Sequence, residues 1–205
     1  VSQPLPEGVV PAPDSERVVA LLKEAENALN TDRKLAESYA KAASVLLPMT
    51  FGLGQAHGRP DKPLPEFVTR NRLTKIQKSE GGMALEALSV QFPIELLGDK
   101  AFGLGHLNAY PDVDGGICAE PLVLQYFDDY YPSMALMIAA RSLNLGPADI
   151  QVRLGEEVRL GKLRIPTDEA GFMNTFFYKG TESRPAFQVD SFYDVLSGKI
   201  PPAKY

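Results

Sequence analysis

The sequence predicts an α/β fold, in which a mixed sheet is flanked by helices within a single domain, with an α+β arrangement as the alternative. Segments with helical apolar spacing and short strand-like segments interleave along the chain, as they do in layered α/β proteins. A chain of 205 residues is long enough to bury one good core. No internal repeat is visible.

The chain opens with an extended lead-in, residues 1–13, which is rich in proline and lacks periodicity. Residues 14–205 are expected to form the domain. Asp14 or Ser15 can cap a first helix, whose apolar residues recur at helical spacing: Val18, Leu21, Leu22, Ala25 and Leu29. Asp32 can cap a second helix, whose apolar side chains face one way: Leu35, Ala36, Tyr39 and Ala43.

An apolar segment, residues 45–51, predicts a buried strand that is interrupted by Pro48. Because proline cannot donate to a sheet ladder, Pro48 indicates an edge or a bulge. Residues 52–73 hold several glycines and prolines and predict a loop. Residues 74–98 carry no clear pattern, although residues 84–90 are compatible with a helix.

The middle of the chain has clearer signals. Residues 102–110 and 117–127 predict two strands, joined by a tight turn at Pro111-Asp-Val-Asp-Gly. Pro132 suits the first turn of a helix, where its missing N–H costs nothing. We expect that helix to run to Gly146.

The following segment predicts mainly β-structure. Residues 150–154 and 158–165 form a hairpin pattern around Gly155-Glu-Glu, and residues 172–178 predict one more strand.

A short helix closes the chain. Ser191 can cap it while Asp194 reaches back to the N–H of the cap residue. Gly198 then ends the helix in the left-handed conformation that glycine adopts at low cost.

The bulk composition narrows the classes of function. The chain has 21 basic and 26 acidic residues, so its net charge is 21 − 26 = −5, and no basic cluster favours a nucleic acid partner. The densest apolar run, residues 134–140, is far shorter than the roughly 20 residues of a membrane-spanning helix. The single cysteine, Cys118, lies in an apolar stretch and is expected to be a small buried side chain.

No catalytic, metal or cofactor site is predicted. Asp112 and Asp114 could share a calcium ion, but the later ligands of a calcium loop are absent, and a turn closed by Gly115 explains them more simply. His106 lacks a second ligand at metal spacing, although it could act with Asp112 across the turn. Ser133 does not lie in the Gly-x-Ser-x-Gly setting of an exposed nucleophile.

An ordered set of motifs runs from Gly105-His-Leu-Asn, through Pro111-Asp-Val-Asp-Gly and Tyr131-Pro-Ser, to Ser191-Phe-Tyr-Asp-Val-Leu-Ser-Gly-Lys-Ile-Pro. In this order and spacing the set resembles the CHASE family, type two, of sensory extracellular domains associated with bacterial cyclases and histidine kinases. The residues that carry the resemblance are Gly105, Pro111, Asp112, Asp114, Gly115, Pro121, Tyr131, Pro132, Ser133, Pro166, Asp168, Asp194 and Gly198.

The resemblance implies a non-catalytic sensor on the extracytoplasmic (periplasmic or cell-surface) face of a bacterial membrane, as part of a membrane-anchored receptor. Its partners would be a small-molecule or physical stimulus and a cytoplasmic cyclase or kinase domain of the same polypeptide. A small-molecule-binding or assembly module without signalling output is the alternative. A hydrolase that uses Asp112, Asp114 and His106 is a third hypothesis.

Two departures from the family pattern stand out. The family usually carries an arginine pair shortly after the Asp-Gly turn, where this chain has Cys118 and Ala119. The family domain also has a strand and helix before the start of this chain and a strand after its end. The expected domain, residues 14–205, is therefore incomplete at both ends, and an uncovered sheet edge would favour a homodimer.

Overall fold

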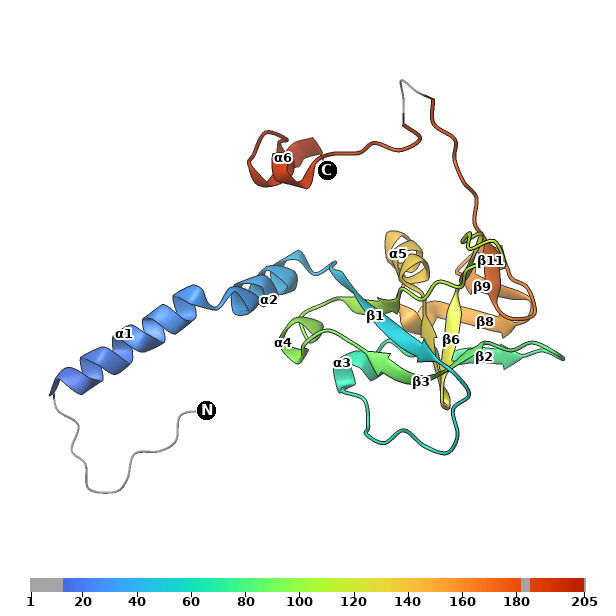
Figure 1. Cartoon of the computed structure of the whole chain (residues 1–205), viewed down its shortest axis with the longest axis horizontal. Helices are drawn as coiled ribbons and strands as arrows, with labels where there is room; N and C mark the ends of the chain where they lie inside the picture. Colours follow the sequence, from blue (N-terminus) through green and yellow to red (C-terminus); the bar gives the residue numbers. More distant parts are fainter. Residues whose placement is uncertain (1–12, 182–184, 205) are drawn as a thin grey trace. The chain divides into compact units, whose positions relative to one another are not determined.

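The structure is a computed structural model that describes residues 13–181 and 185–204 (Figure 1). The chain divides into two units, Val1–Met173 and Asn174–Tyr205, which are described separately below. Mixed sheets and helices make up the first unit, so the predicted α/β class is confirmed. Apart from Pro13, which begins the first helix, the predicted lead-in lies outside the described residues.

A five-stranded mixed sheet lies at the centre of the first unit (Figure 1). Its strand order is β4-β1-β3-β6-β7, with parallel pairs β4–β1 and β3–β6 and antiparallel pairs β1–β3 and β6–β7. The strands are β1 (Leu46–Leu53), β3 (Leu85–Gln91), β4 (Gly103–His106), β6 (Val123–Tyr126) and β7 (Asp129–Pro132).

A four-stranded mixed sheet has the order β10-β9-β8-β2. Its strands are β2 (Lys75–Lys78), β8 (Ile150–Leu154), β9 (Glu157–Leu160) and β10 (Leu163–Pro166). The predicted hairpin is confirmed as β8–β9, although residues 158–165 fold into parts of two strands rather than one. A third sheet pairs β5 (Ala119–Pro121) with β11 (Phe172–Asn174), so the single strand expected over residues 117–127 is divided between two sheets.

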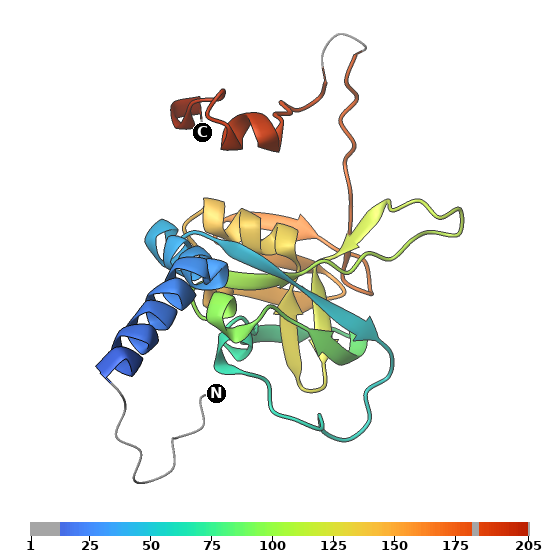
Figure 2. The ribbon, with the colours of Figure 1, turned by 60° about the vertical axis from the view of Figure 1, so that its left-hand side comes forward.

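The helices of the first unit differ in length. They are α1 (Pro13–Leu29), α2 (Thr31–Ala42), α3 (Glu66–Thr69), α4 (Glu95–Gly98), α5 (Met134–Ser142) and the 3₁₀ turn η1 (Pro147–Asp149). Helix α5 packs on β4 and β1 of the five-stranded sheet (Figure 2). It ends at Ser142, four residues before the predicted end at Gly146, and Asn144 beyond it has a φ of 57°.

Buried apolar side chains form two clusters. One joins α5 to the four-stranded sheet and includes Leu136, Met137, Ile150, Val152, Leu154, Val158 and Leu160. The other gathers side chains of the five-stranded sheet and α3: Met49, Phe51, Phe67, Val68, Leu104, Leu124, Tyr126 and Tyr131. Since Ile150, Val152 and Leu154 alternate with exposed residues along β8, one face of the four-stranded sheet belongs to the core and the other is open.

The predictions for residues 84–90 and for Pro48 need correction. Residues 84–90 are compatible with a helix by sequence, but Leu85–Gln91 forms β3 between β1 and β6. A short apolar run has no decisive period of its own, and the neighbouring strands decide its structure. Pro48 lies on an interior strand rather than an edge strand, yet only β4 pairs with β1 at that point, because pairing with β3 starts at Thr50.

Three predictions of where helices start are also wrong. Helix α1 begins at Pro13, so Asp14 and Ser15 lie inside it. Helix α2 is capped by Asn30, whose side chain accepts a hydrogen bond from the Arg33 N–H at 3.0 Å, and not by Asp32. Pro132 ends β7, and the following residue caps α5. In α2, Asn30 and Asp32 are both residue types suited to an N-cap, and local sequence does not decide between them.

The second unit contains α6 (Phe192–Leu196) and the 3₁₀ turn η2 (Pro202–Lys204). Gly198 has the predicted left-handed conformation, with a φ of 75°. The predicted capping box is wrong, because Ser191 makes no side-chain cap bond and the Asp194 carboxylate instead accepts from Lys199 Nζ at 2.8 Å. The strand expected over residues 172–178 ends at Asn174.

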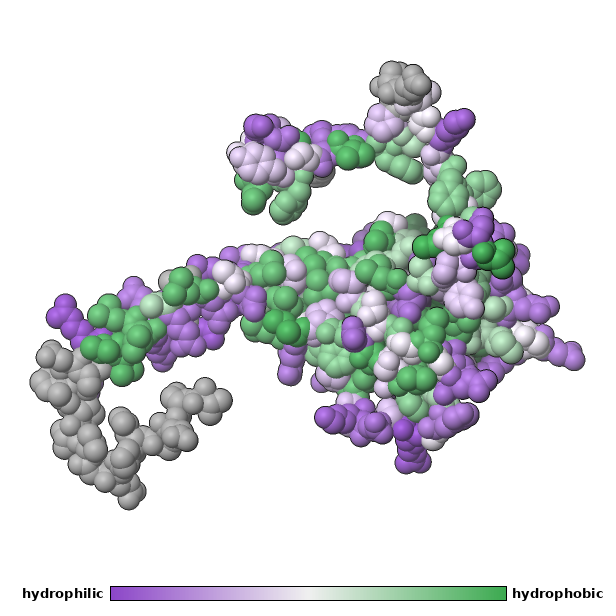
Figure 3. All heavy atoms as spheres, viewed as in Figure 1, coloured by the Kyte–Doolittle hydropathy of each residue, from purple (hydrophilic) through white to green (hydrophobic). Residues whose placement is uncertain are grey.

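Helix α1 presents apolar side chains to solvent. Figure 3 shows a run of hydrophobic residues along this helix beside a run of polar ones. The exposed apolar residues are Val18, Val19, Leu21, Leu22 and Leu29. Over the described part of the chain, no helix combines the length and apolar character needed to cross a bilayer.

Candidate functional site

The open face of the four-stranded sheet carries a shallow groove of about 370 Å³. We call it the polar groove. The side chains that project into it come from alternate positions of β2, β8 and β9, because successive residues of a strand point to opposite faces. Its polar and charged lining residues are Thr74, Lys75, Gln77, Gln151, Arg153, Glu157 and Arg159.

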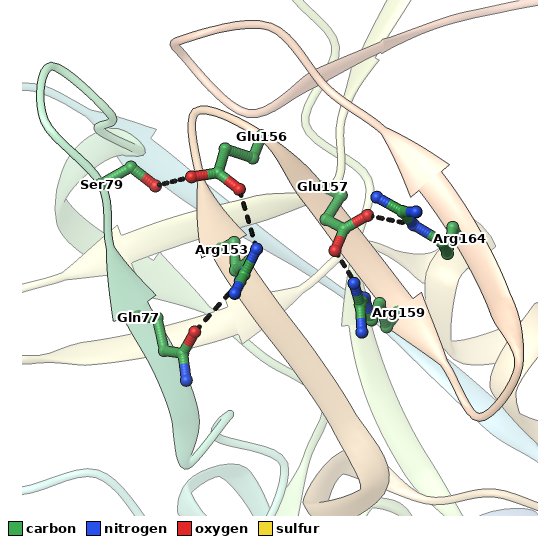
Figure 4. A network of polar contacts seen from close by, with 7 residues as sticks. All are labelled: Gln77, Ser79, Arg153, Glu156, Glu157, Arg159 and Arg164. Carbon is green, nitrogen blue, oxygen red and sulfur yellow. Dashed lines mark hydrogen bonds and ion pairs between the residues drawn. The ribbon is translucent and has the colours of Figure 1, made fainter.

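Glu157 is the buried carboxylate at one side of the polar groove (Figure 4). Its side chain is only 5% exposed and accepts hydrogen bonds from Arg164 Nε, at 2.6 Å, and from Arg159 Nε. The bond from Arg164 is the main cause that holds the pKa of Glu157 below its usual value; burial opposes it and Arg159 adds to it. Glu157 therefore stays ionised and fixes the direction of two guanidinium groups.

Arg153 occupies the middle of a second set of polar contacts beside the first (Figure 4). Its Nε donates to Gln77 Oε1 at 3.2 Å, and its Nη1 lies 3.1 Å from Glu156 Oε2. The Ser79 hydroxyl donates to the other oxygen of Glu156 at 2.8 Å. These bonds tie β2, β8 and the β8–β9 turn together, and they hold the side chains of Gln77 and Arg153 in place in the groove.

A second hollow, of about 560 Å³, lies between the loop after β1 and strand β3. The loop contributes Arg59, Asp61 and Lys62, and the sheet side contributes the apolar residues Leu88 and Val90. Much of its wall is loop. Because side chains on strands hold their geometry better than side chains on loops, we take the polar groove as the candidate site.

His106 is buried at the end of β4 and is 1% exposed. Its ring lies 6.2 Å from that of Phe51, edge to face, and neither ring nitrogen has a hydrogen-bond partner among the described residues. Burial lowers the pKa of His106 to about 3. Asp112 is exposed and does not bond to the ring, so the structure does not form the acid–base pair that the hydrolase hypothesis requires.

The burial of His106 predicts a loss of stability in mild acid. The unfolded chain binds a proton at the ordinary pKa of 6.5, whereas the folded chain binds it only near 3. Between these values stability falls as pH is lowered, by about 2 kcal/mol between about pH 7.5 and 5. Urea unfolding at both pH values measures this difference.

Two variants test whether His106 causes this loss of stability in mild acid. His106→Leu removes the titrating ring and should flatten the decline, while His57→Gln changes an exposed histidine and should preserve it. An unchanged decline in His106→Leu would mean that other groups cause it.

Residues 9–205 match the CHASE2 domain family. The chain belongs to that family. CHASE2 domains are sensory extracellular domains, so the resemblance predicted from the ordered motifs is confirmed. The chain matches no curated protein and no solved structure.

The residues that carry the CHASE2 resemblance do not meet at one place. Gly105 lies on β4 directly against the start of α5, where its α-carbon faces the backbone of Ser133 and Met134. Ser133 caps α5, its hydroxyl accepting from the Leu136 N–H at 3.2 Å. The fold thus brings Gly105 and Ser133 together: Gly105 permits the close approach of β4 to α5, and Ser133 caps that helix.

The Asp-x-Asp-Gly segment of this CHASE2 domain forms a turn. Gly115 has a φ of 82°, and its N–H donates to the Asp112 carbonyl at 2.8 Å. The Asp114 carboxylate accepts from the Gly116 N–H at 2.9 Å. Among the described residues, no cluster of three histidine, cysteine or acidic side chains could hold a metal ion.

Cys118 is exposed, which corrects the expectation of a buried thiol. A hydrogen bond with Asp112 is the main cause that raises its thiol pKa. Position 118 is one of the two at which the family resemblance implies arginine, and it lies beside a carboxylate. In this chain the side chain at position 118 that meets Asp112 is therefore a thiol and not a guanidinium.

The remaining motif residues close strands and turns. Asp168 accepts from the N–H groups of Ala170 and Phe172, at 3.0 and 2.8 Å. Three prolines each end a strand: Pro121, Pro132 and Pro166. Tyr131 is buried in the second core cluster. Asp194 and Gly198 belong to the second unit. None of them lines the polar groove.

The residues of the polar groove were not predicted as site residues from the sequence. The polar positions of β8, Gln151 and Arg153, alternate with apolar ones, and that alternation is the signal by which an outward-facing polar row could have been recognised. Lys75 and Gln77 lie about 75 residues away in the sequence, and only the parallel pairing of β2 with β8 brings them to the same face.

Proposed function

We propose that this chain is the extracytoplasmic sensor domain of a bacterial transmembrane receptor, and that it passes a stimulus to a cytoplasmic cyclase or kinase domain of the same polypeptide. Membership of the CHASE2 family, over residues 9–205, is the observation that carries this proposal. The family is one of sensors rather than enzymes, and we propose a non-catalytic role here too.

The polar groove supports a binding role for the domain. Its side chains converge from three strands, and ion pairs hold two of them, Arg153 and Arg159, in place; a preorganised set of polar groups is typical of small-molecule sites. The Glu157–Arg159–Arg164 ion pairs stand on β9 and β10, so a ligand that draws Arg159 toward itself changes the contacts between those strands.

Signal transfer would follow from differential affinity. A ligand that binds one arrangement of the domain more tightly than another shifts the population toward the first. A tenfold difference in affinity shifts the equilibrium by about 1.4 kcal/mol, which sets the largest response that such a ligand can cause.

The output of the intact receptor tests the proposal. The gene that encodes this chain is expressed in full, and its cyclase or kinase activity is measured with the domain present and with the domain replaced by an inert one. We expect the replacement to abolish regulation while basal output persists. If the complete protein has no cyclase or kinase domain, or if its output is independent of this domain, the chain is a binding or assembly module without signalling output.

A further inference from the structure

The open face of the four-stranded sheet is electropositive on an acidic chain. It carries the cations Lys75, Arg153, Arg159 and Arg164 and the carboxylates Glu156 and Glu157. The sum over these six residues is 4 − 2 = +2, whereas the whole chain has a net charge of −5. A local excess of cations on such a chain concentrates anions at this face.

The strand register arranges these cations in a row. Lys75 is paired with Gln151, Gln151 with Arg159, and Arg159 with Arg164, so one line crosses all four strands without a carboxylate. The next line on the same face runs from Gln77 through Arg153 to Glu157. Like charges directly opposite each other, as in Arg159 and Arg164, destabilise a sheet. Glu157 offsets that repulsion from its place beside both.

The network leaves donors unused. Lys75 makes no hydrogen bond or ion pair among the described residues, and its side chain is exposed. Arg159 bonds to Glu157 through Nε, and no described residue bonds to its two terminal nitrogens. Gln151 stands between them in the row and offers an amide N–H₂. Lys75, Gln151 and Arg159 thus present donors to the groove.

We propose that the polar groove binds a small dianion, such as a dicarboxylate or a phosphate, through Lys75, Arg159 and Gln151, with Arg153 at the side. Guanidinium groups match the paired oxygens of a carboxylate or phosphate, and an ammonium contributes a compact charge. Glu157 acts as a positioning residue that holds the Arg159 guanidinium in place. The claim that the dianion is the receptor's stimulus rests on the proposed sensor function, whereas the claim that the groove binds a dianion does not.

Calorimetric titration of the 205-residue chain at low salt tests the inference. The probes are succinate and inorganic phosphate, with acetate as a monoanion and succinamide as a neutral analogue. We expect one or both dianions to bind at least about tenfold more tightly than acetate, because a dianion can accept more charge-assisted hydrogen bonds from the groove than a monoanion can. The tighter of the two dianions identifies the ligand chemistry. Equal affinity for acetate, or no heat with either dianion, overturns the proposal.

Strand β2 offers a matched control. Lys75→Gln removes a cation from the groove, while Lys78→Gln makes the same change on the opposite face, where Lys78 Nζ lies 6.0 Å from the Tyr130 ring centre. We expect Lys75→Gln to weaken dianion binding about tenfold and Lys78→Gln to leave it within about twofold. Equal losses would mean a general charge effect and would overturn the site.

This result is independent of the receptor assay. If the chain binds a dianion in the groove but the intact receptor does not respond to it, the sensor proposal fails and the site stands. If the receptor signals but the groove variants bind as the unmodified chain does, the site is wrong and the sensor role stands. A circular-dichroism melt of each variant confirms that both keep the fold.

Discussion

Gly105→Ala is expected to lower the free energy of unfolding by about 3 kcal/mol. A β-carbon at position 105 would lie 2.6 Å from the α-carbon of Met134 and 2.7 Å from its nitrogen. Both are backbone atoms at the start of α5, so no side-chain rotation relieves the contact. The helix would have to move away from β4, and the core cluster between α5 and the four-stranded sheet would loosen.

Urea unfolding measures this loss, and Gly146→Ala is its control. Gly146 has an extended φ of −120°, and a β-carbon there would lie 4.0 Å from the nearest neighbouring atom. Its change in stability should stay within about 0.5 kcal/mol. Equal stability of the two variants would show that the close approach of β4 and α5 is not maintained in solution.

Asn71→Ala is expected to cost a comparable amount, about 3 kcal/mol. The Asn71 side chain is 1% exposed and connects α3 to β4. Its Nδ2 donates to the Phe67 carbonyl at 2.7 Å, and its Oδ1 accepts from the Leu104 N–H at 2.9 Å. Alanine leaves these backbone groups buried without partners, and the penalty for unsatisfied groups exceeds the net value of the bonds themselves.

Asn108→Ala provides the comparison for that variant. The Asn108 side chain also bonds to backbone groups: it donates to the Phe51 carbonyl at 2.7 Å and accepts from the Phe51 N–H at 2.9 Å. It is, however, only partly buried. Water can replace its bonds, so the loss should be about 1 kcal/mol. The midpoints of urea unfolding, compared at a common dependence of the unfolding free energy on urea concentration, give the loss of stability in each variant. A larger loss in Asn108→Ala than in Asn71→Ala would contradict the assigned burial.

The parts of the fold that sequence predicts well are those with complete local patterns. The β8–β9 hairpin has apolar residues at Ile150, Val152 and Leu154 and a glycine at its turn, so period and turn agree. The αL conformation of Gly198 and the turn closed by Gly115 follow in the same way from glycine at a position with positive φ.

Elements decided by distant partners are predicted poorly. Strand β3 has a short apolar run that fits a helix as well as a strand, and its identity depends on pairing with β1 and β6. Asn71 looks like a loop residue until α3 and β4 meet around it. Cys118 lies in an apolar stretch but next to the exposed Asp112 turn, so its neighbours in sequence misrepresent its exposure.

The polar groove is the feature that the sequence predicts least well, because it too depends on pairing between strands that are distant in the sequence. Each of its charges is an ordinary exposed residue on its own strand, and charged side chains on a strand usually mean a solvated face. Lys75 joins Arg159 only because β2 pairs in parallel with β8 and β8 in antiparallel with β9. The family motifs gave no guide to this face, since they lie at turns, caps and strand ends elsewhere.

The most direct measurement combines the two proposals in the complete receptor. Its cyclase or kinase output is recorded while succinate or phosphate is added, in the unmodified protein, in Lys75→Gln and in Lys78→Gln. We predict that the dianion changes the output, that Lys75→Gln shifts the half-maximal concentration upward by about tenfold, and that Lys78→Gln responds as the unmodified protein does. If neither dianion changes the output, or if Lys75→Gln and Lys78→Gln respond identically, the claim that the receptor senses a dianion bound at this sheet face would be contradicted.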